Sequence, residues 1–298
     1  MKILLFGKQG QVGYELQRAL RPLGHIVALD RNGHDSLCGD LADTQGIAST
    51  IARVRPDVIV NAAAHTAVDR AESEADLAFA INATAPDVMA QEAAKLGSLL
   101  IHYSTDYIFD GSGARPWRET DTPAPLNTYG RSKLAGEQAI QASGCQHLIL
   151  RTSWVYGKHG HNFVKTVLRL AQERQSLAMV ADQIGAPTGA RLIADVTAKA
   201  LATAIHQRQS GIYHLAASGE TSWHGYATFI VEQARANGLQ LATERIEPVA
   251  SSAFPTPAQR PANSRLDTGK LQRQFALHLP PWQEGVSQLI KELTGISA

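Results

Sequence analysis

The chain has 298 residues, 44% of them hydrophobic and 18% charged, a composition that excludes a disordered protein and suffices for one large or two smaller folded units. Its formal net charge of +1 gives no electrostatic reason to expect nucleic acid or an anionic membrane as partner. Two distant cysteines, Cys38 and Cys145, exclude a disulfide framework, and no apolar run is long enough for a signal peptide or a membrane span. We therefore expect a soluble, cytoplasmic protein.

Apolar runs of strand length come first along the chain, at 2–7, 26–30, 57–61, 99–104 and 147–151. They lack polar alternation, which is typical of strands buried on both faces of a parallel sheet. Segments with helical periodicity lie between them, at 11–23, 44–54, 75–96 and 129–143. This β-α-β-α order predicts an α/β fold built on a Rossmann-type doubly wound parallel sheet with right-handed crossovers.

The rhythm of strands and helices breaks after about residue 156. Glycine, proline and aromatic residues become frequent, as in "DQIGAPTG" (182–189) and "FPTPAQRPANSR" (254–265). We predict a dinucleotide-binding domain over 1–156 and a smaller α/β substrate domain formed mainly by 157–298. The chain is expected to return to the first sheet around 190–216, where "GIYHLA" has the composition of another strand.

A glycine-rich loop, Gly7-x-x-Gly10-x-x-Gly13, joins the first predicted strand to the first predicted helix. Gly7 would permit the tight turn, Gly10 would let the backbone approach a pyrophosphate at the helix N-terminus, and Gly13 would let helix and strand pack closely. A tight turn without any ligand is the alternative. Asp30, at the end of the next strand, argues against it, because a carboxylate there accepts hydrogen bonds from an adenosine ribose.

Further residues around the same loop bear on the choice of dinucleotide. Arg31 can reach a 2′-phosphate, whereas Asp30 favours a free 2′-hydroxyl, so the sequence predicts use of both NADPH and NADH. Asp40 would lie beside the adenine, although an aspartate there can equally cap a helix. The stretch "NAAAHT" (61–66) ends a strand in small residues, which would let a dinucleotide cross the carboxyl edge of the sheet.

Candidate catalytic residues come from two later segments. "HYSTDYIFDG" (102–111) places Thr105 and Asp106 at the carboxyl end of a buried strand, where open α/β sheets bind ligands, although a hydroxyl there can simply cap a turn. Tyr129 and Lys133 lie one helical turn apart in "NTYGRSKLAGE". By itself that spacing often arises by chance, but next to a dinucleotide crevice it predicts a proton donor with a neighbouring cation.

Together these motifs resemble the extended short-chain dehydrogenase/reductase superfamily and, within it, the dTDP-4-dehydrorhamnose reductases. The similarity also covers "VNAAAHTAVDRAESE", "LRTSWVYG", "NFVKTVLRLA", "DQIGAPTGA" and "RPANSRLDTGKL", and so extends over essentially the whole chain. Nucleotide-sugar dehydratases of this superfamily carry a carboxylate after Thr-Asp, whereas this chain has Tyr107, which favours simple carbonyl reduction. The resemblance implies NAD(P)H-dependent reduction of the C4 ketone of dTDP-4-dehydro-6-deoxy-L-mannose to dTDP-L-rhamnose, for surface polysaccharide.

The resemblance also implies roles for individual residues. Tyr129 would be the general acid, Thr105 would polarise the carbonyl, and Lys133 would hold the nicotinamide ribose and lower the pKa of Tyr129. The residues expected to bind the cofactor are Gly7, Gly10, Gln11, Val12, Gly13, Asp30, Arg31, Asp40, Leu41, Ala64, His65, Thr66, Tyr103, Tyr129 and Lys133. Those expected to bind the dTDP-sugar are Thr105, Asp106, Trp154, Asn162, Phe163, Asp182, Gln183, Thr188, Arg260 and Arg265.

Two other function classes, and other roles for single residues, stay open at this point. An epimerase or dehydratase of the same fold would act on a related nucleotide sugar, and a regulatory relative, like the β-subunit of methionine adenosyltransferase, would only bind a partner. For either arginine above, a solvated surface charge is as reasonable as a diphosphate ligand, and Trp154 could be a core residue. The resemblance allows a magnesium ion and a homodimer, but no cluster of acidic residues calls for a metal, and the histidines of "HGH" (159–161) lack acidic neighbours.

Overall fold

The structure, a computed structural model, describes residues 1–295 and is centred on a six-stranded sheet. The strand order is β10-β5-β4-β3-β1-β2, and all neighbours run parallel. The strands are β1 (Lys2–Phe6), β2 (His25–Leu29), β3 (Val58–Asn61), β4 (Leu99–Thr105), β5 (His147–Thr152) and β10 (Gly211–His214). The Rossmann-type sheet predicted from the apolar runs is confirmed.

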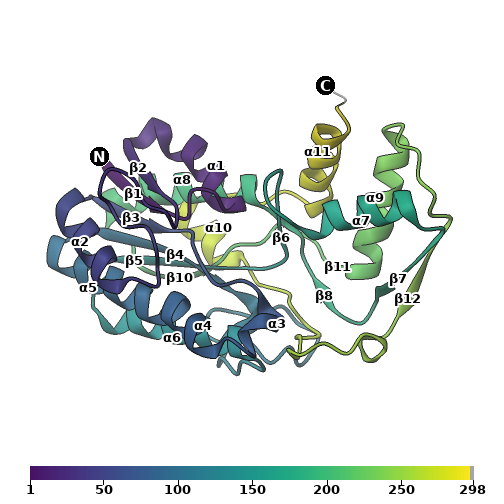
Figure 1. Cartoon of the computed structure of the whole chain (residues 1–298), viewed down its shortest axis with the longest axis horizontal. Coiled ribbons are helices and arrows are strands. Elements are labelled where there is room, and N and C mark those ends of the chain that lie inside the picture. Colours follow the sequence, from purple (N-terminus) through teal and green to yellow (C-terminus); the bar gives the residue numbers. More distant parts are fainter. Residues whose placement is uncertain (296–298) are drawn as a thin grey trace.

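Helices cover both faces of this sheet (Figure 1). On one face lie α1 (Gln11–Leu20), α8 (Ala190–Gln207) and α10 (Gly269–Phe275), and on the other α2 (Thr44–Val54), α5 (Ala85–Leu96) and α6 (Thr128–Ala142). Alternate residues of β1 serve the two cores: Ile3 and Leu5 pack with α1 and α8, whereas Leu4 packs with α2 and α5. Among residues 1–295, no helix is both long and apolar enough to cross a membrane.

The sheet is completed by a segment from late in the chain. β10 pairs with β5 from Gly211 opposite Leu148 to His214 opposite Arg151. The helix that leads into it, α8, packs against α1. The N-terminal half, residues 190–214 and α10 thus build one layered unit, although the chain leaves that unit between these segments.

A second, smaller body lies beyond the carboxyl ends of the strands (Figure 1). Its helices share one apolar core that includes Val167, Tyr226 and Trp282. Two short helices follow β3 of the large sheet: α3 (Val68–Ala71) and α4 (Ala75–Phe79). The other elements come later in the chain and are β6 (Val155–Tyr156), α7 (Phe163–Glu173), β7 (Ser176–Val180), β8 (Ile184–Gly185), β9 (Thr188–Gly189), β11 (Thr221–Ser222), α9 (Trp223–Ala236), β12 (Arg245–Val249) and α11 (Trp282–Thr294).

The helix predicted over 75–96 is interrupted by one turn of π-helix, Ala80–Thr84, between α4 and α5. Asn82 in this turn is buried; its side chain accepts from the His65 N–H at 2.8 Å and donates to Ser132 Oγ at 3.0 Å. The turn also lies tightly against α6, where a Cβ on Gly136 would stand 2.1 Å from the Asn82 carbonyl oxygen. These tertiary contacts account for the irregular turn, which periodicity could not reveal.

Candidate active site

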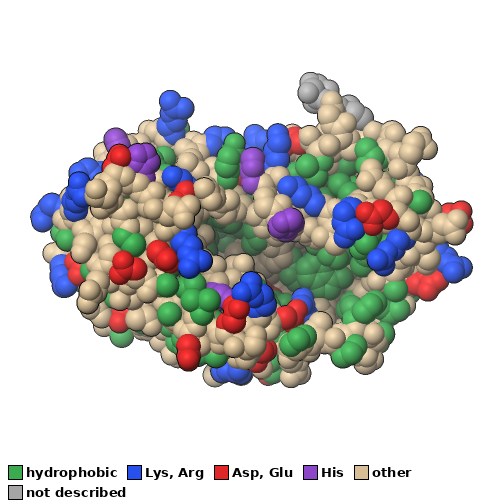
Figure 2. All heavy atoms as spheres, in the orientation of Figure 1, with side chains coloured by type: hydrophobic (Ala, Val, Ile, Leu, Met, Phe, Trp, Pro, Cys, Tyr) green, Lys and Arg blue, Asp and Glu red, His purple; other side chains and the backbone are tan. Residues whose placement is uncertain are grey.

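A cleft of about 750 Å³ opens at the carboxyl ends of β1, β3, β4 and β5. After β1 the chain turns to β2 on one side and later to β3 on the other, so the cleft lies where the strand order reverses, the usual ligand position in such sheets. Figure 2 shows the hollow between the two bodies, with hydrophobic side chains along one wall. Its wall includes these predicted residues: Gly7, Gly10, Gln11, Val12, Asp30, Arg31, Ala64, Thr66, Tyr103, Thr105, Asp106, Tyr129, Lys133 and Trp154.

The glycine loop forms one wall and leaves no room for side chains at its closest approaches. Gly7 has a φ of +85°, and a Cβ there would stand 2.7 Å from the Ala63 nitrogen. A Cβ on Gly13 would come within 2.0 Å of the Gly7 carbonyl oxygen, so Gly13 lets α1 pack against the loop rather than lining the cleft. Gly10 caps the N-terminus of α1, whose free N–H groups suit a phosphate group. The loop therefore fits a pyrophosphate.

The charges at the end of β2 are paired in the structure. Asp30 accepts from Gln9 Nε2 at 2.8 Å and lies 3.3 Å from Lys8 Nζ. The Arg31 side chain is 80% exposed, and its Nε lies 3.3 Å from Asp40 Oδ2. The Arg31 contact is single and largely exposed, which leaves this side chain able to turn toward a ligand, whereas the Lys8–Asp30 pair is partly buried.

Three of the residues predicted to bind the cofactor, Asp40, Leu41 and His65, lie outside the cleft wall. Asp40 Oδ1 accepts from the Ala42 N–H at 3.0 Å and so stabilises a turn; it does not cap a helix, because Asp43 is the N-cap of α2, and it is not part of the cleft wall. Leu41 is 4% exposed and packs into the core beneath α2, so its side chain cannot reach a ligand. The His65 ring, also outside the wall, lies 3.1 Å from Glu74 Oε2.

Thr105, Tyr129 and Lys133 meet on the cleft wall below the end of β4. The Thr105 hydroxyl donates to Asp106 Oδ1 at 3.1 Å and accepts from the Tyr107 N–H at 3.2 Å. Asn127 begins α6, accepting from the Gly130 N–H at 2.8 Å, and this cap fixes the turn that carries Tyr129. The predicted grouping of a hydroxyl, a phenol and an amine at one place in the cleft is therefore present.

The electrostatics of this group differ from the expectation. Burial raises the pKa of Tyr129 to about 12; the Thr105 hydroxyl lowers it and the Asp106 charge raises it further. Burial lowers the pKa of Lys133 to about 8, against the opposing charge of Glu137. Lys133 was expected to lower the pKa of Tyr129, but burial is the largest influence on the phenol and the net shift is upward. Lys133 Nζ donates to the Tyr103 carbonyl oxygen at 2.6 Å.

Two buried residues, His102 and Asn61, escaped prediction. The His102 ring lies 3.0 Å from Lys133 Nζ on one side and 3.1 Å from Asn61 Nδ2 on the other. Both are polar residues in otherwise apolar strands, and they lie opposite each other in β3 and β4; this was the signal in the sequence that could have found them. Asp106, predicted to touch the sugar, is also buried, and burial raises the pKa of its carboxyl to about 6.

Aromatic side chains form the far wall, on the side of the smaller body. Trp154 has a φ of +47°, a left-handed conformation unusual for a bulky residue, and its ring stacks on Trp223 at 3.7 Å between centroids. Gly185 lies against the same ring, where a Cβ would come within 2.7 Å. A neighbouring pocket of about 1060 Å³ is lined by Phe163, Gln183, Trp223 and Arg260, among others. Such a wall suits a planar base or a sugar ring.

The other predicted sugar contacts do not line these pockets. Thr188 is fully buried at the start of β9, and its hydroxyl donates to the carbonyl oxygen of Ala186, two residues earlier, at 3.0 Å. Asn162 caps α7, and its Nδ2 donates to Gln11 Oε1 at 3.0 Å. Asp182 accepts from the Ser251 N–H at 2.9 Å. Arg265 pairs with Glu220 at 2.6 Å, so its charge is already matched.

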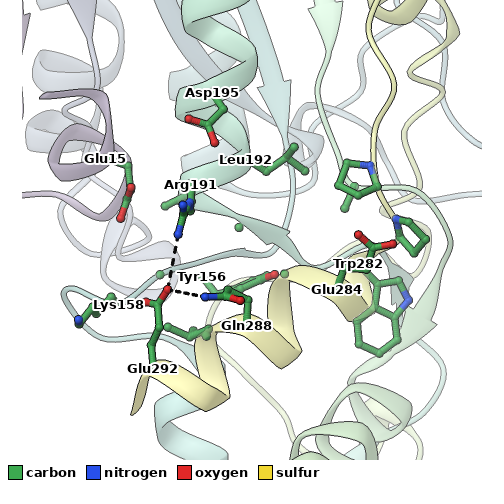
Figure 3. A pocket seen from close by; sticks show the side chains of 18 residues that line it. Glu15, Tyr156, Lys158, Arg191, Leu192, Asp195, Trp282, Glu284, Gln288 and Glu292 are labelled. Carbon is green, nitrogen blue, oxygen red and sulfur yellow. Dashed lines mark hydrogen bonds and ion pairs between the residues drawn. The ribbon is translucent and has the colours of Figure 1, made fainter. Parts of the chain in front are cut away.

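Another pocket, of about 420 Å³, lies between α1, α8 and α11 (Figure 3). Glu15, Asp195 and Glu292 line it, but arginines neutralise them: Arg191 lies 3.6 Å from Glu292, and Arg18 contacts both Glu15 and Asp195. Within residues 1–295, no group of three or more histidine, cysteine or acidic side chains could hold a metal ion.

The doubly wound sheet, the glycine loop at its switch point and the Thr-Tyr-Lys group in one cleft define a dinucleotide-dependent oxidoreductase of the extended short-chain dehydrogenase/reductase type. Comparison with known proteins agrees with this class. Residues 1–295 match the family described as "RmlD substrate binding domain".

Individual relatives narrow the class. The dTDP-4-dehydrorhamnose reductase of Shigella flexneri is 56% identical over 294 residues, which cover 98% of both chains. The crystal structure of that enzyme from Bacillus anthracis, in complex with NADP, has a TM-score of 0.87 and 35% identity, covering 98% of this chain and 99% of the other. Its counterpart from Clostridium acetobutylicum has a TM-score of 0.88 and 32% identity, with the same coverage. The chain belongs to the dTDP-4-dehydrorhamnose reductase family.

Proposed function

We propose that this enzyme reduces the C4 ketone of dTDP-4-dehydro-6-deoxy-L-mannose to dTDP-L-rhamnose, with NADPH or NADH as the hydride source. The observation that carries the proposal is the convergence of Thr105, Tyr129 and Lys133 in a cleft whose other end is the glycine loop. Membership of the family supports the substrate. An epimerase, a dehydratase or a regulatory subunit does not account for relatives of this identity.

The dinucleotide belongs to the larger body, formed by residues 1–156 together with the segment that returns around 190–216. Its pyrophosphate would lie against Gly7 and Gly10, with the free N–H groups of α1 facing the phosphates. Asp30 would accept from an adenosine ribose, and Arg31 and Lys8 are near enough to Asp30 to meet a 2′-phosphate. Lys133 would hold the nicotinamide ribose. The bound nicotinamide supplies the hydride that reaches C4.

Tyr129 supplies the proton that the C4 oxygen gains. A pKa of about 12 keeps the buried phenol protonated at neutral pH, which is the form that a reductase needs in its proton donor. The Thr105 hydroxyl is placed to hydrogen-bond the same oxygen as negative charge develops on it. Lys133, charged below pH about 8, places a cation one helical turn from the phenol, which stabilises the phenolate left after proton transfer.

The smaller body, mainly residues 157–298, would bind the dTDP-sugar. Trp154 and Phe163 offer aromatic surface, and Gln183 offers amide groups, although its Nε2 and Oε1 already contact Ser251 and Trp223. Arg260 is the diphosphate candidate: its Nη2 lies 2.7 Å from Asp69, while its buried Nε has no partner among the described residues. Asn162, Asp182, Thr188 and Arg265 would act behind this surface, by holding its loops.

The test is loss of NADPH absorbance on addition of dTDP-4-dehydro-6-deoxy-L-mannose, with NMR of the product to establish the rhamnose configuration. A reductase consumes one NADPH for each sugar, whereas an epimerase leaves net NADPH unchanged. Isomerisation of the sugar without loss of NADPH would refute the proposal.

We also propose a cytoplasmic location and a homodimer, both from the family resemblance. Cys38 and Cys145 are both free thiols, which agrees with a reducing compartment. Sedimentation velocity tests the dimer, and fractionation of cells tests the location.

A further inference from the structure

His102 is buried at the centre of the sheet, directly beneath the catalytic group. It lies in β4 opposite Asn61 of β3 and Ile149 of β5. Asn61 and His102 are each 1% exposed, and Lys133 is 2% exposed. Very little of these side chains reaches water, so their polar atoms need partners within the protein.

The position of the imidazole proton follows from the backbone. Asn61 Oδ1 accepts from the Ala63 N–H at 3.2 Å, which turns the amide nitrogen toward the ring, 3.1 Å from His102 Nδ1. An amide nitrogen can only donate, so Nδ1 must accept. Burial holds the pKa of His102 well below its usual value, which keeps the ring neutral with one N–H. That hydrogen therefore lies on Nε2.

The Nε2–H group faces Lys133 Nζ at 3.0 Å. An ammonium has three donors and no lone pair, so lysine can accept this hydrogen bond only as the neutral amine. We propose that Asn61 and His102 form a positioning pair that fixes the imidazole proton on Nε2 and so favours the neutral amine of Lys133 over its ammonium. The inference deepens the proposed function, because it concerns how Lys133 is tuned for its role there.

Other groups around Lys133 act in different directions. Glu137, one turn further along α6, favours the ammonium, but it is held in a buried ion pair with Arg151, at 2.6 Å. Tyr129 and Tyr103 are neutral phenols at working pH, since burial raises the pKa of both. The pair thus acts together with burial, which lowers the pKa of Lys133 to about 8.

The first test is the pH dependence of kcat/KM in two variants. His102→Leu removes the N–H that opposes the ammonium, so the basic limb should move to higher pH, by about half a unit or more, given the usual strength of one hydrogen bond. Asn61→Asp keeps the shape but accepts from the ring, which moves the proton to Nδ1 and turns Nε2 into an acceptor for the ammonium. Its limb should also move upward. Asn237→Asp, at the end of α9, adds the same charge far from the cleft and should leave the limb in place.

The sign of the shift decides between two roles for His102. If the ring instead accepted a hydrogen bond from the Lys133 ammonium, His102→Leu would move the limb to lower pH. That result, or an unmoved limb in both variants, would overturn the proposal.

The second test needs no turnover and no intact His102→Leu fold. In protein labelled with ¹⁵N-histidine, the His102 signals, assigned by their loss in His102→Gln, should show a proton on Nε2 in the wild type. They should show a proton on Nδ1 in Asn61→Asp. A wild-type proton on Nδ1 would overturn the proposal. Wild-type protein that failed to reduce the sugar would defeat the proposed function, whereas the tautomer would still be measured.

Discussion

The role of Tyr129 as proton donor can be tested by removing a single atom. Tyr129→Phe removes the phenolic oxygen and keeps the ring, which packs edge-on against Tyr107 at 5.6 Å between centroids. Because burial already holds the phenol protonated, with a pKa of about 12, the variant loses a fully populated acid rather than a minor form. General acid catalysis is worth roughly 10²–10⁴-fold, so kcat should fall by that factor, or about 3–5 kcal/mol of barrier.

The assay is steady-state NADPH oxidation, with the Kd of NADPH measured in parallel by fluorescence. The matched control is Tyr226→Phe, since Tyr226 is also buried and its hydroxyl has no partner among the described residues, so its loss leaves no polar group stranded. That control should keep nearly full activity. If Tyr129→Phe turned over at a near-normal rate with unchanged NADPH binding, the phenol would not be the acid and the mechanism would be wrong.

Three further changes probe the cleft. Lys133→Met removes the amine whose pKa is about 8. NADPH should then bind more weakly, and the basic limb of the pH–rate profile should move to higher pH. An unmoved limb would mean that Lys133 only anchors the ribose. Steady-state kinetics should show kcat/KM values for NADPH and NADH that differ by no more than about 100-fold, or ~2.7 kcal/mol. Arg31→Ala should weaken the use of NADPH selectively, and Asp30→Ala should weaken the use of NADH selectively. Equal losses for both cofactors in Arg31→Ala would show that Arg31 does not recognise the 2′-phosphate. Treatment with EDTA should leave activity unchanged, because Glu15, Asp195 and Glu292, in the pocket between α1, α8 and α11, are paired with arginines. Activity lost to EDTA and restored by Mg²⁺ would contradict this.

Much of the fold could be predicted because strands buried on both faces are apolar without interruption. The strand-length runs of the first 151 residues all became strands of the one sheet, and "GIYHLA" supplied its last strand. The π-helical turn could not be predicted, since Asn82 departs from periodicity to reach His65 and Ser132, the latter 50 residues away.

The residues of the site also fall into those that the sequence could predict and those that it could not. Residues at the carboxyl ends of strands, such as Thr105, were found because the topology places strand ends together. Residues whose role depends on where a side chain points were not: Thr188 points into the protein, and Arg265 pairs with Glu220. His102 was missed because its partners lie 41 and 31 residues away and its own strand is apolar.

The late arrival of β10 has a consequence for how the protein is made. A ribosome that has released only the first 156 residues has delivered neither β10 nor α8, so the β5 edge is unpaired and the α1 face of the sheet is half covered. The nucleotide-binding body can close only after the intervening segment, with α7 and the β7 strand, has emerged. Native assembly of the two bodies is therefore coupled, and a nascent chain arrested before residue 190 should depend on chaperones to protect its exposed sheet.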